Sequence, residues 1–176
     1  MSAFDVVNTY SEQQLAGIIS SYGEERFARR IAQGIVRARA SAPVNTTFEL
    51  VDIIKAAMPK AAQRDAHPAR RTFQAIRIEV NGELAGLQTA LPEMFGVLNT
   101  GGVLAVITFH SLEDRIVKEY FAQLGKGCTC PKDFPVCVCG KKPQARVHSA
   151  GVKASEQEVL ANSRSRSAKL RTAVKA

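Results

Sequence analysis

The chain has 176 residues, of which 45% are hydrophobic, so it is long enough to bury a core and has the composition of a soluble globular protein. No apolar run approaches the length of a membrane span and the first residues lack a secretory signal pattern, which argues against a membrane partner and predicts a cytoplasmic location. The net charge of +8 and the pI of about 9.6 favour an anionic partner.

Three helices with short breaks are predicted in the first sixty-odd residues. The first starts at a capping box formed by Ser11 and Gln14 and ends at or near Gly23. The third starts at a second capping box, Thr46 with Glu49, and stops before Pro59. We therefore predict a small helical domain over residues 1–66.

The second of these helices is expected from about Glu24 to Ala40, with Phe27, Ile31 and Ile35 on its apolar face. The rest of its surface carries five arginines: Arg26, Arg29, Arg30, Arg37 and Arg39. A solvated helix face and a nucleic-acid contact both remain open for them.

A long helical pattern follows a linker and has apolar residues at helical spacing up to Leu98. Asn81-Gly82 and Pro92 are expected to bend or divide it, and we expect it to lie against a sheet. Arg70, Arg71 and Arg77 stand near its start, where their charge opposes the helix dipole, so phosphate contact is one interpretation and plain solvent exposure the other. His67 is expected only to lead into the helix.

Residues 101–115 indicate one strand-to-helix unit of an α/β ligand-binding fold. The apolar run Val103–Phe109 suits a parallel strand buried on both faces. Ser111 is expected to cap the next helix, with Asp114 completing the capping box. His110, Ser111 and Arg115 would then lie at the carboxyl end of the strand, where open α/β sheets bind ligands; the alternative is that they only cap and fill a turn.

Most of the excess charge lies in residues 141–176, with nine Lys or Arg against two Glu. This tail, which contains S-R-S-R-S-A-K-L-R, could contact phosphates or form a solvated surface. The alternation in residues 168–174 also permits a closing strand, with Leu170 and Val174 inward and the basic residues outward.

Four cysteines form two C-x-C pairs, Cys128 with Cys130 and Cys137 with Cys139, in a loop spanning residues 126–142. Four clustered thiolates suit a zinc site, but the one-residue spacer is shorter than usual, and reduced loop thiols are the alternative. No metal ligand is assigned on this evidence.

Three longer stretches carry a family resemblance: S-Y-G-E-E-R-F-A-R-R-I-A, H-P-A-R-R-T-F-Q-A-I-R-I-E-V-N-G-E-L and F-H-S-L-E-D-R-I-V-K. The basic tail and C-T-C-P-K-D-F-P-V-C-V-C-G add to it. From about residue 11 onward the chain resembles the bacterial 16S rRNA (cytosine-N4) methyltransferase H family, also called the MraW-like family.

The resemblance implies methylation of a cytosine N4 in 16S rRNA with S-adenosylmethionine as cofactor, and 16S rRNA or the small ribosomal subunit as partner. It also implies an α/β fold: a class I, Rossmann-like methyltransferase sheet with an inserted all-helical domain. Residues 67–176 would be the C-terminal part of that sheet domain, and its N-terminal half would be missing. A homodimer is possible.

No glycine-rich cofactor loop is found, so no cofactor-binding residue is assigned and the catalytic residues stay unknown. The isolated chain is expected to be catalytically silent, with Arg70, Arg71, Arg77, His110 and Arg115 as candidate RNA contacts. The alternative is a non-catalytic RNA- or ribosome-binding module with a possible zinc-stapled loop. A remnant of a longer reading frame is a third interpretation.

Overall fold

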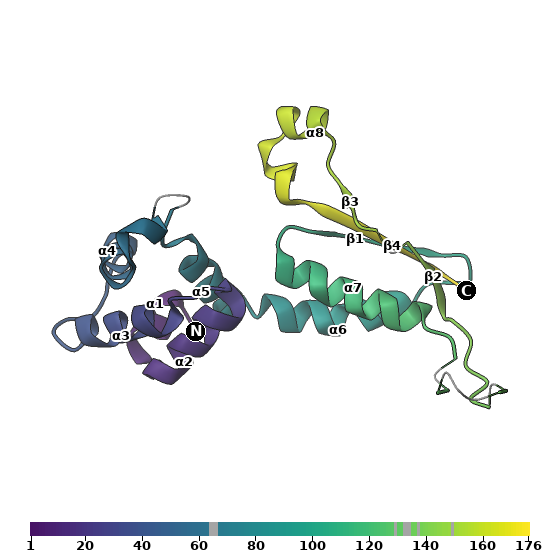
Figure 1. Cartoon of the computed structure of the whole chain (residues 1–176), viewed down its shortest axis with the longest axis horizontal. Helices are drawn as coiled ribbons and strands as arrows, with labels where there is room; N and C mark the ends of the chain where they lie inside the picture. The colour runs from purple at the N-terminus through teal and green to yellow at the C-terminus, as the bar shows by residue number, and fades with distance from the viewer. Residues whose placement is uncertain (64–66, 129, 132–134, 137, 149) are drawn as a thin grey trace. The chain divides into compact units, whose positions relative to one another are not determined.

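The computed structural model describes residues 1–63, 67–128, 130–131, 135–136, 138–148 and 150–176. They form two compact units, Met1–Glu83 and Leu84–Ala176 (Figure 1). The division therefore falls later than residue 66, because the helix that follows the linker packs within the first unit. None of the helices in the described ranges is long and apolar enough to span a membrane.

The first unit is all helical. Its elements are α1 (Ala3–Thr9), α2 (Glu12–Gly23), α3 (Ala28–Arg39), α4 (Thr47–Ala57), a short 3-10 helix η1 (Lys60–Gln63) and α5 (Arg70–Asn81). The capping boxes predicted at Ser11 and Thr46 are confirmed. Each hydroxyl accepts the backbone N–H of the residue three positions on, and the side chain of that residue, Gln14 or Glu49, accepts the backbone N–H of the capping residue.

Two expectations for this unit were wrong. Helix α3 begins at Ala28 rather than near Glu24, because Glu24 takes the left-handed conformation that ends α2, with φ of 49°. Helix α1 was not predicted at all, although Ser2 and Asp5 form a capping box at its start.

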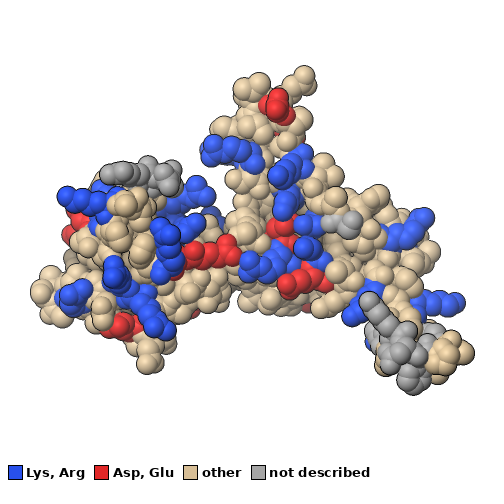
Figure 2. Space-filling view, in the orientation of Figure 1, with Lys and Arg blue, Asp and Glu red and all other residues tan. Residues whose placement is uncertain are grey.

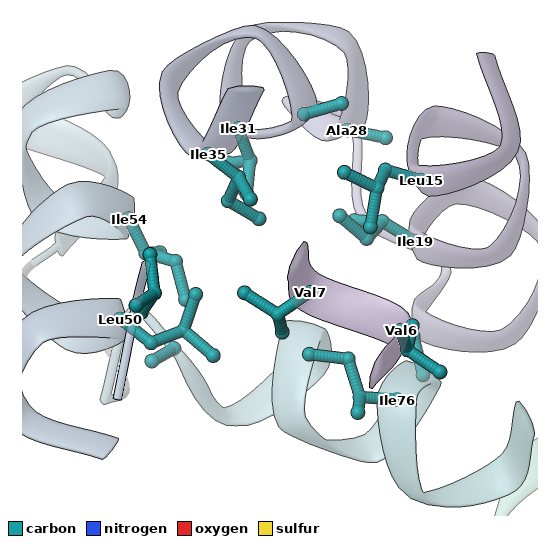
Figure 3. Packing of buried hydrophobic residues seen from close by; sticks show 14 of the residues in the cluster. Val6, Val7, Leu15, Ile19, Ala28, Ile31, Ile35, Leu50, Ile54 and Ile76 are labelled. Atoms are coloured by element: carbon teal, nitrogen blue, oxygen red, sulfur yellow. The ribbon is translucent and has the colours of Figure 1, made fainter. Parts of the chain in front are cut away.

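One hydrophobic core joins the helices of this unit. Figure 3 shows Leu15 and Ile19 from α2, Ile31 and Ile35 from α3, and Ile76 from α5 pointing toward a common centre. All five are buried, and Val6, Val7, Leu50 and Ile54 complete the group. The core fixes the starts of α3 and α5 in one unit, which matters for the site described below.

At Gly23 the backbones of α2 and α5 approach each other closely. A Cβ built on it would lie 2.7 Å from the backbone oxygen of Arg71, whereas one built on Gly17 of the same helix meets nothing within 4 Å. We expect Gly23→Ala to lower the free energy of unfolding by about 1–3 kcal/mol, because backbone must move. Gly17→Ala, the matched control, should raise it by about 0.5–1 kcal/mol. Urea unfolding of both variants measures this; equal effects would contradict the close approach.

The second unit is mixed α/β. Its elements are α6 (Glu83–Gly96, starting at the boundary), β1 (Val103–Thr108), α7 (Ser111–Gly125), β2 (Ala145–Val147), β3 (Val152–Lys153), α8 (Glu156–Ala161), a 3-10 helix η2 (Ser163–Ser167) and β4 (Lys169–Lys175). Gly82, with φ of 60°, ends α5 as predicted, but α6 continues through Pro92 and is not divided there.

The sheet is small and antiparallel, which corrects the expected parallel strand. β4 lies between β1 and β2 and pairs antiparallel with both, and β3 pairs with β4 further along (Figure 1). β1 is also not buried on both faces: Leu104 and Thr108 are buried, whereas Val103 and Ile107 are 55% and 59% exposed. One face of β1 and one of its edges have no neighbour among the described residues.

Helices α6 and α7 cover the other face of the sheet (Figure 1). Leu91 and Phe95 of α6 and Val117, Phe121 and Leu124 of α7 form a second core with Leu104, Ala145 and Ala173. The expectation that the long helical pattern lies against the sheet is thus confirmed for α6 but was wrong for α5, which belongs to the helical unit.

The closing strand is confirmed as β4, but its predicted facing was wrong. Arg171 and Ala173 are the buried residues, and Leu170 and Val174 lie half-buried on the opposite face. The basic side chain can face inward because a carboxylate from α7 meets it there, as the next subsection describes.

Candidate nucleic-acid interface

Arginines gather around a surface hollow of about 370 Å³ in the helical unit. The lining comes from the segment before α3, from the end of α4 and from the start of α5: Glu25, Arg26, Phe27, Met58, Ala62, His67, Pro68, Arg70 and Arg71. We call it the arginine hollow. Arg26, Arg70 and the outer part of Arg71 are exposed, so three guanidinium groups border one concave surface.

The starts of two helices face this hollow. Neither α3 nor α5 has a side-chain cap or an acidic residue in its first turn, and both carry arginines there instead. The amide groups at a helix start carry partial positive charge, and arginine beside them adds to it. Such an arrangement is unfavourable for an isolated helix and favourable for binding an anion.

Glu25 is a buried acidic residue in the lining of the hollow, where it contacts both the segment before α3 and the start of α5. Its side chain is almost fully buried, its Oε1 accepts the backbone N–H of Phe27 at 2.9 Å, and its Oε2 lies 3.9 Å from Nη1 of Arg71. One buried carboxylate thereby links the chain before α3 to the first turn of α5. Glu25 contacts Arg71 only through Nη1, and the Arg71 side chain is 57% exposed, so other N–H donors of its guanidinium remain accessible to solvent.

A second, larger hollow of about 990 Å³ adjoins the first and shares Glu25, Arg26 and Phe27 with it. It runs along α2 and adds Arg29 and Arg30. Arg26 stacks over the ring of Phe27, 4.8 Å from its centroid, which holds one guanidinium near the ridge between the two hollows. Figure 2 shows Lys and Arg side chains gathered on the helical unit in this view.

Two arginines of the same unit are engaged elsewhere. Arg77 pairs with Glu83, Nε to Oε1 and Nη2 to Oε2 both at 2.9 Å, and does not line the arginine hollow. Arg39 donates to the backbone oxygens of Val7 and Tyr10 and so ties α3 to α1. Of the candidates named from sequence, Arg70 and Arg71 therefore lie together and Arg77 lies apart, while His67, expected only to lead into the helix, is part of the lining.

His110 lies at the carboxyl end of β1, as predicted, but the capping assignment there was wrong. The cap of α7 is His110 itself: its Nδ1 accepts the N–H of Glu113 at 3.3 Å, and Glu113 accepts the N–H groups of Phe109 and His110. Ser111 is the first helical residue. The His110 side chain is 11% exposed, so its main observed role is to start α7. Arg115 is exposed on the same helix.

Asp114, expected to complete the cap, instead forms a partly buried ion cluster with β4. Its oxygens accept from Nε of Arg171 at 2.6 Å and from Nζ of Lys169 at 2.8 Å. The hydrogen bond from Arg171 is the largest reason that the pKa of Asp114 falls from 3.8 to about 2. The cluster ties the start of α7 to the sheet.

The basic tail is thereby partly committed to the fold. Besides Lys169 and Arg171, Lys175 donates to the backbone oxygens of Phe95, Gly96 and Leu98 and so satisfies the carbonyl end of α6. Arg164 and Arg166, on η2, remain exposed. The tail thus offers fewer outward charges than its composition indicated.

The comparisons with known proteins identify the family. The model of the MraW methylase family matches residues 1–176. The chain is 59% identical over 99% of its length to Ribosomal RNA small subunit methyltransferase H of Symbiobacterium thermophilum, and covers 56% of that protein. The proteins of the same name from Clostridium botulinum and Heliobacterium modesticaldum are 55% and 52% identical over 97% and 99% of the chain, which again covers 56% of each.

The chain thus spans slightly more than half the length of the curated relatives it matches. The match is continuous through the arginine hollow, the sheet and the basic tail, and the resemblance predicted from sequence is confirmed. On this evidence the chain belongs to the MraW methylase family.

Proposed function

We propose that this chain provides the RNA-binding part of an S-adenosylmethionine-dependent methyltransferase that modifies N4 of a cytosine in 16S rRNA. The observation that carries the proposal is the arginine hollow, in a chain whose relatives are named for methylation of small-subunit ribosomal RNA. The cytosine N4 and the 16S molecule come from the family resemblance.

The chemistry of the hollow suits an RNA backbone. Arg26, Arg70 and Arg71 present forked donors that match phosphate oxygens, and the partial positive charge at the two helix starts adds to their attraction for an anion. The Arg26 guanidinium, held over the Phe27 ring, offers a planar surface on which an unstacked base could stack beside the phosphates. Among the five tentative contacts, Arg70 and Arg71 have the strongest support; Arg77, His110 and Arg115 stay candidates for weaker or indirect roles.

The glycine turn before β1 does not fit the cofactor. At the turn before β1, the Gly101 N–H donates to the Lys175 oxygen at 2.9 Å and the Gly102 N–H to the Asn99 oxygen at 2.8 Å. Both backbone donors that a glycine turn would offer to a carboxylate or ribose are thus used within the protein. We derive no chemical step through S-adenosylmethionine from these residues.

The open edge and open face of β1 support the remaining part of the proposal. A strand with half-exposed Val103 and Ile107 and an unpaired edge, as far as the described residues go, suits a sheet completed by further strands. We propose that a segment equivalent to the rest of the relatives' length completes this sheet and supplies the cofactor loop. The chain alone then binds RNA and transfers no methyl group.

Isothermal titration with S-adenosylmethionine tests the cofactor part of this proposal. We expect no heat beyond dilution from the folded chain, up to millimolar cofactor, because the glycine turn before β1 uses both of its backbone donors within the protein. The full-length relative from Symbiobacterium thermophilum is the positive control, and circular dichroism confirms that the chain is folded. Saturable one-to-one binding would contradict the proposal and assign the cofactor pocket to this chain.

A further inference from the structure

Three of the four cysteines lie together although they come from both C-x-C pairs. The Sγ atoms of Cys128, Cys130 and Cys139 all lie within 4.8 Å of one another, and those of Cys128 and Cys139 are 3.7 Å apart. The fourth cysteine, Cys137, lies outside the described residues. All the thiols of the chain therefore fall within one loop, and three of them converge.

One of the sulfur separations, that between Cys128 and Cys139, matches the value for a thiolate metal site. With zinc–sulfur bonds of about 2.3 Å, two sulfurs on a regular tetrahedron lie about 3.8 Å apart. The S–S bond of a disulfide is about 2.05 Å long. The longer separation of the Cys128 and Cys139 sulfurs therefore suits two ligands of one metal ion rather than a disulfide. A disulfide would also leave the third sulfur of the group outside the bond.

The backbone around the sulfurs is arranged to support a metal. The N–H of Cys130 donates to Sγ of Cys128 at 3.4 Å, the kind of contact that orients a ligand sulfur and offsets its negative charge. Gly140, directly after Cys139, has φ of 62°, which lets the chain turn away from the sulfur at once. Both features position thiols without contributing to a hydrophobic core.

Two apolar side chains of the loop, Val136 and Val138, are 69% and 73% exposed and so are not packed. The ends of the loop are joined, since the Gln144 N–H donates to the Leu124 oxygen at 2.8 Å. A structural metal contributes most to folding where few apolar side chains are packed.

The charge around the cluster also suits a thiolate site. Lys126, Lys141 and Lys142 flank the cysteines and line one surface depression beside the end of α7. Zinc with three or four thiolates carries a net negative charge, and the lysines that flank the cysteines in the sequence have the opposite sign. From the sulfur geometry, the joined loop and this charge, we propose that Cys128, Cys130 and Cys139 are ligands of a structural zinc ion.

This site is independent of the proposed function, because it needs neither RNA nor cofactor. Its test uses the whole chain, purified with reductant and supplied with zinc, and then with cobalt in its place. We expect one zinc per chain by elemental analysis, together with thiolate-to-cobalt charge transfer and the intense visible bands of a tetrahedral site with at least three sulfur ligands. When a thiol reagent is added, the amount of zinc released should rise together with the number of cysteine thiols that have reacted.

The matched variants are Cys128→Ser, Cys139→Ser and Val138→Ala. Both serine variants should lose the stoichiometric metal and the cobalt bands, while Val138→Ala, which changes an exposed neighbour in the same loop, should keep them. Circular dichroism shows whether the rest of the chain stays folded. Substoichiometric zinc without tetrahedral cobalt bands, or metal retained equally by the serine variants, would overturn the proposal.

Discussion

Replacing Asp114 by alanine is expected to lower the free energy of unfolding of the α/β unit by about 3–5 kcal/mol, the range for breaking a buried ion pair from one side. The reason is Arg171, which is 6% exposed and would keep its charge in the interior without the carboxylate that faces it. Lys169, at 34% side-chain exposure, can turn to water and contributes less.

Denaturant unfolding followed by a probe in the α/β unit measures this effect. Glu119→Ala is the matched control, because it removes an exposed carboxylate from the same helix and should change stability by at most about 0.5 kcal/mol. The double variant Asp114→Leu with Arg171→Met should recover most of the loss, since neither charge is then buried. A wild-type stability for Asp114→Ala would show that the cluster does not join α7 to β4.

The same contact predicts an acid response. The pKa of Asp114 is about 2 in the folded chain and 3.8 without its partners, so the stability it contributes is present above about pH 4. As the pH falls from about 5 to 1, the wild type should lose about 2 kcal/mol from this group, and Asp114→Asn should lack that loss. Equal acid profiles for the two proteins would contradict the lowered pKa.

The triple variant Arg26→Gln, Arg70→Gln and Arg71→Gln is expected to bind small-subunit ribosomal RNA at least about tenfold more weakly at moderate salt. Each guanidinium that contacts a phosphate releases counterions from the RNA, so the slope of log affinity against log salt should also become shallower by about 2. Filter binding of the folded chain over a range of salt concentrations measures both quantities.

Arg37→Gln serves as the control for this variant. It also removes positive charge from the helical unit, but Arg37 lies in the last turn of α3 and lines neither of the two hollows. It should bind nearly as the wild type does. If the triple variant kept both the affinity for RNA and the salt slope, the arginine hollow would not be the RNA contact surface.

The elements that were predictable are those set by local chemistry. The boxes at Ser11 and Thr46 fix α2 and α4 because the capping hydroxyl and its partner are only three residues apart. The apolar run at 103–108 identifies β1 for the same local reason. Gly82 ends α5 because its left-handed conformation suits a residue without a Cβ.

What the sequence did not reveal depends on contacts between distant segments. Arg171 faces inward only because Asp114, 57 residues earlier, meets it, so a rule that turns basic residues outward fails at this strand. The arginine hollow likewise needs the starts of α3 and α5 to lie side by side, which follows from the core and from the backbone approach at Gly23. Uncapped, arginine-bearing helix starts at both positions are the signal that could have found it.

Crosslinking of the folded chain to small-subunit ribosomal RNA, with the crosslinked peptides identified by mass spectrometry, tests the central claim most directly. The basic tail is the competing surface, since Arg164 and Arg166 are exposed there. We predict that crosslinks concentrate in residues 26–30 and 67–71, which border the two hollows. Crosslinks confined to residues 141–176, or none above those to a competitor polyanion, would contradict the assignment of RNA binding to the helical unit.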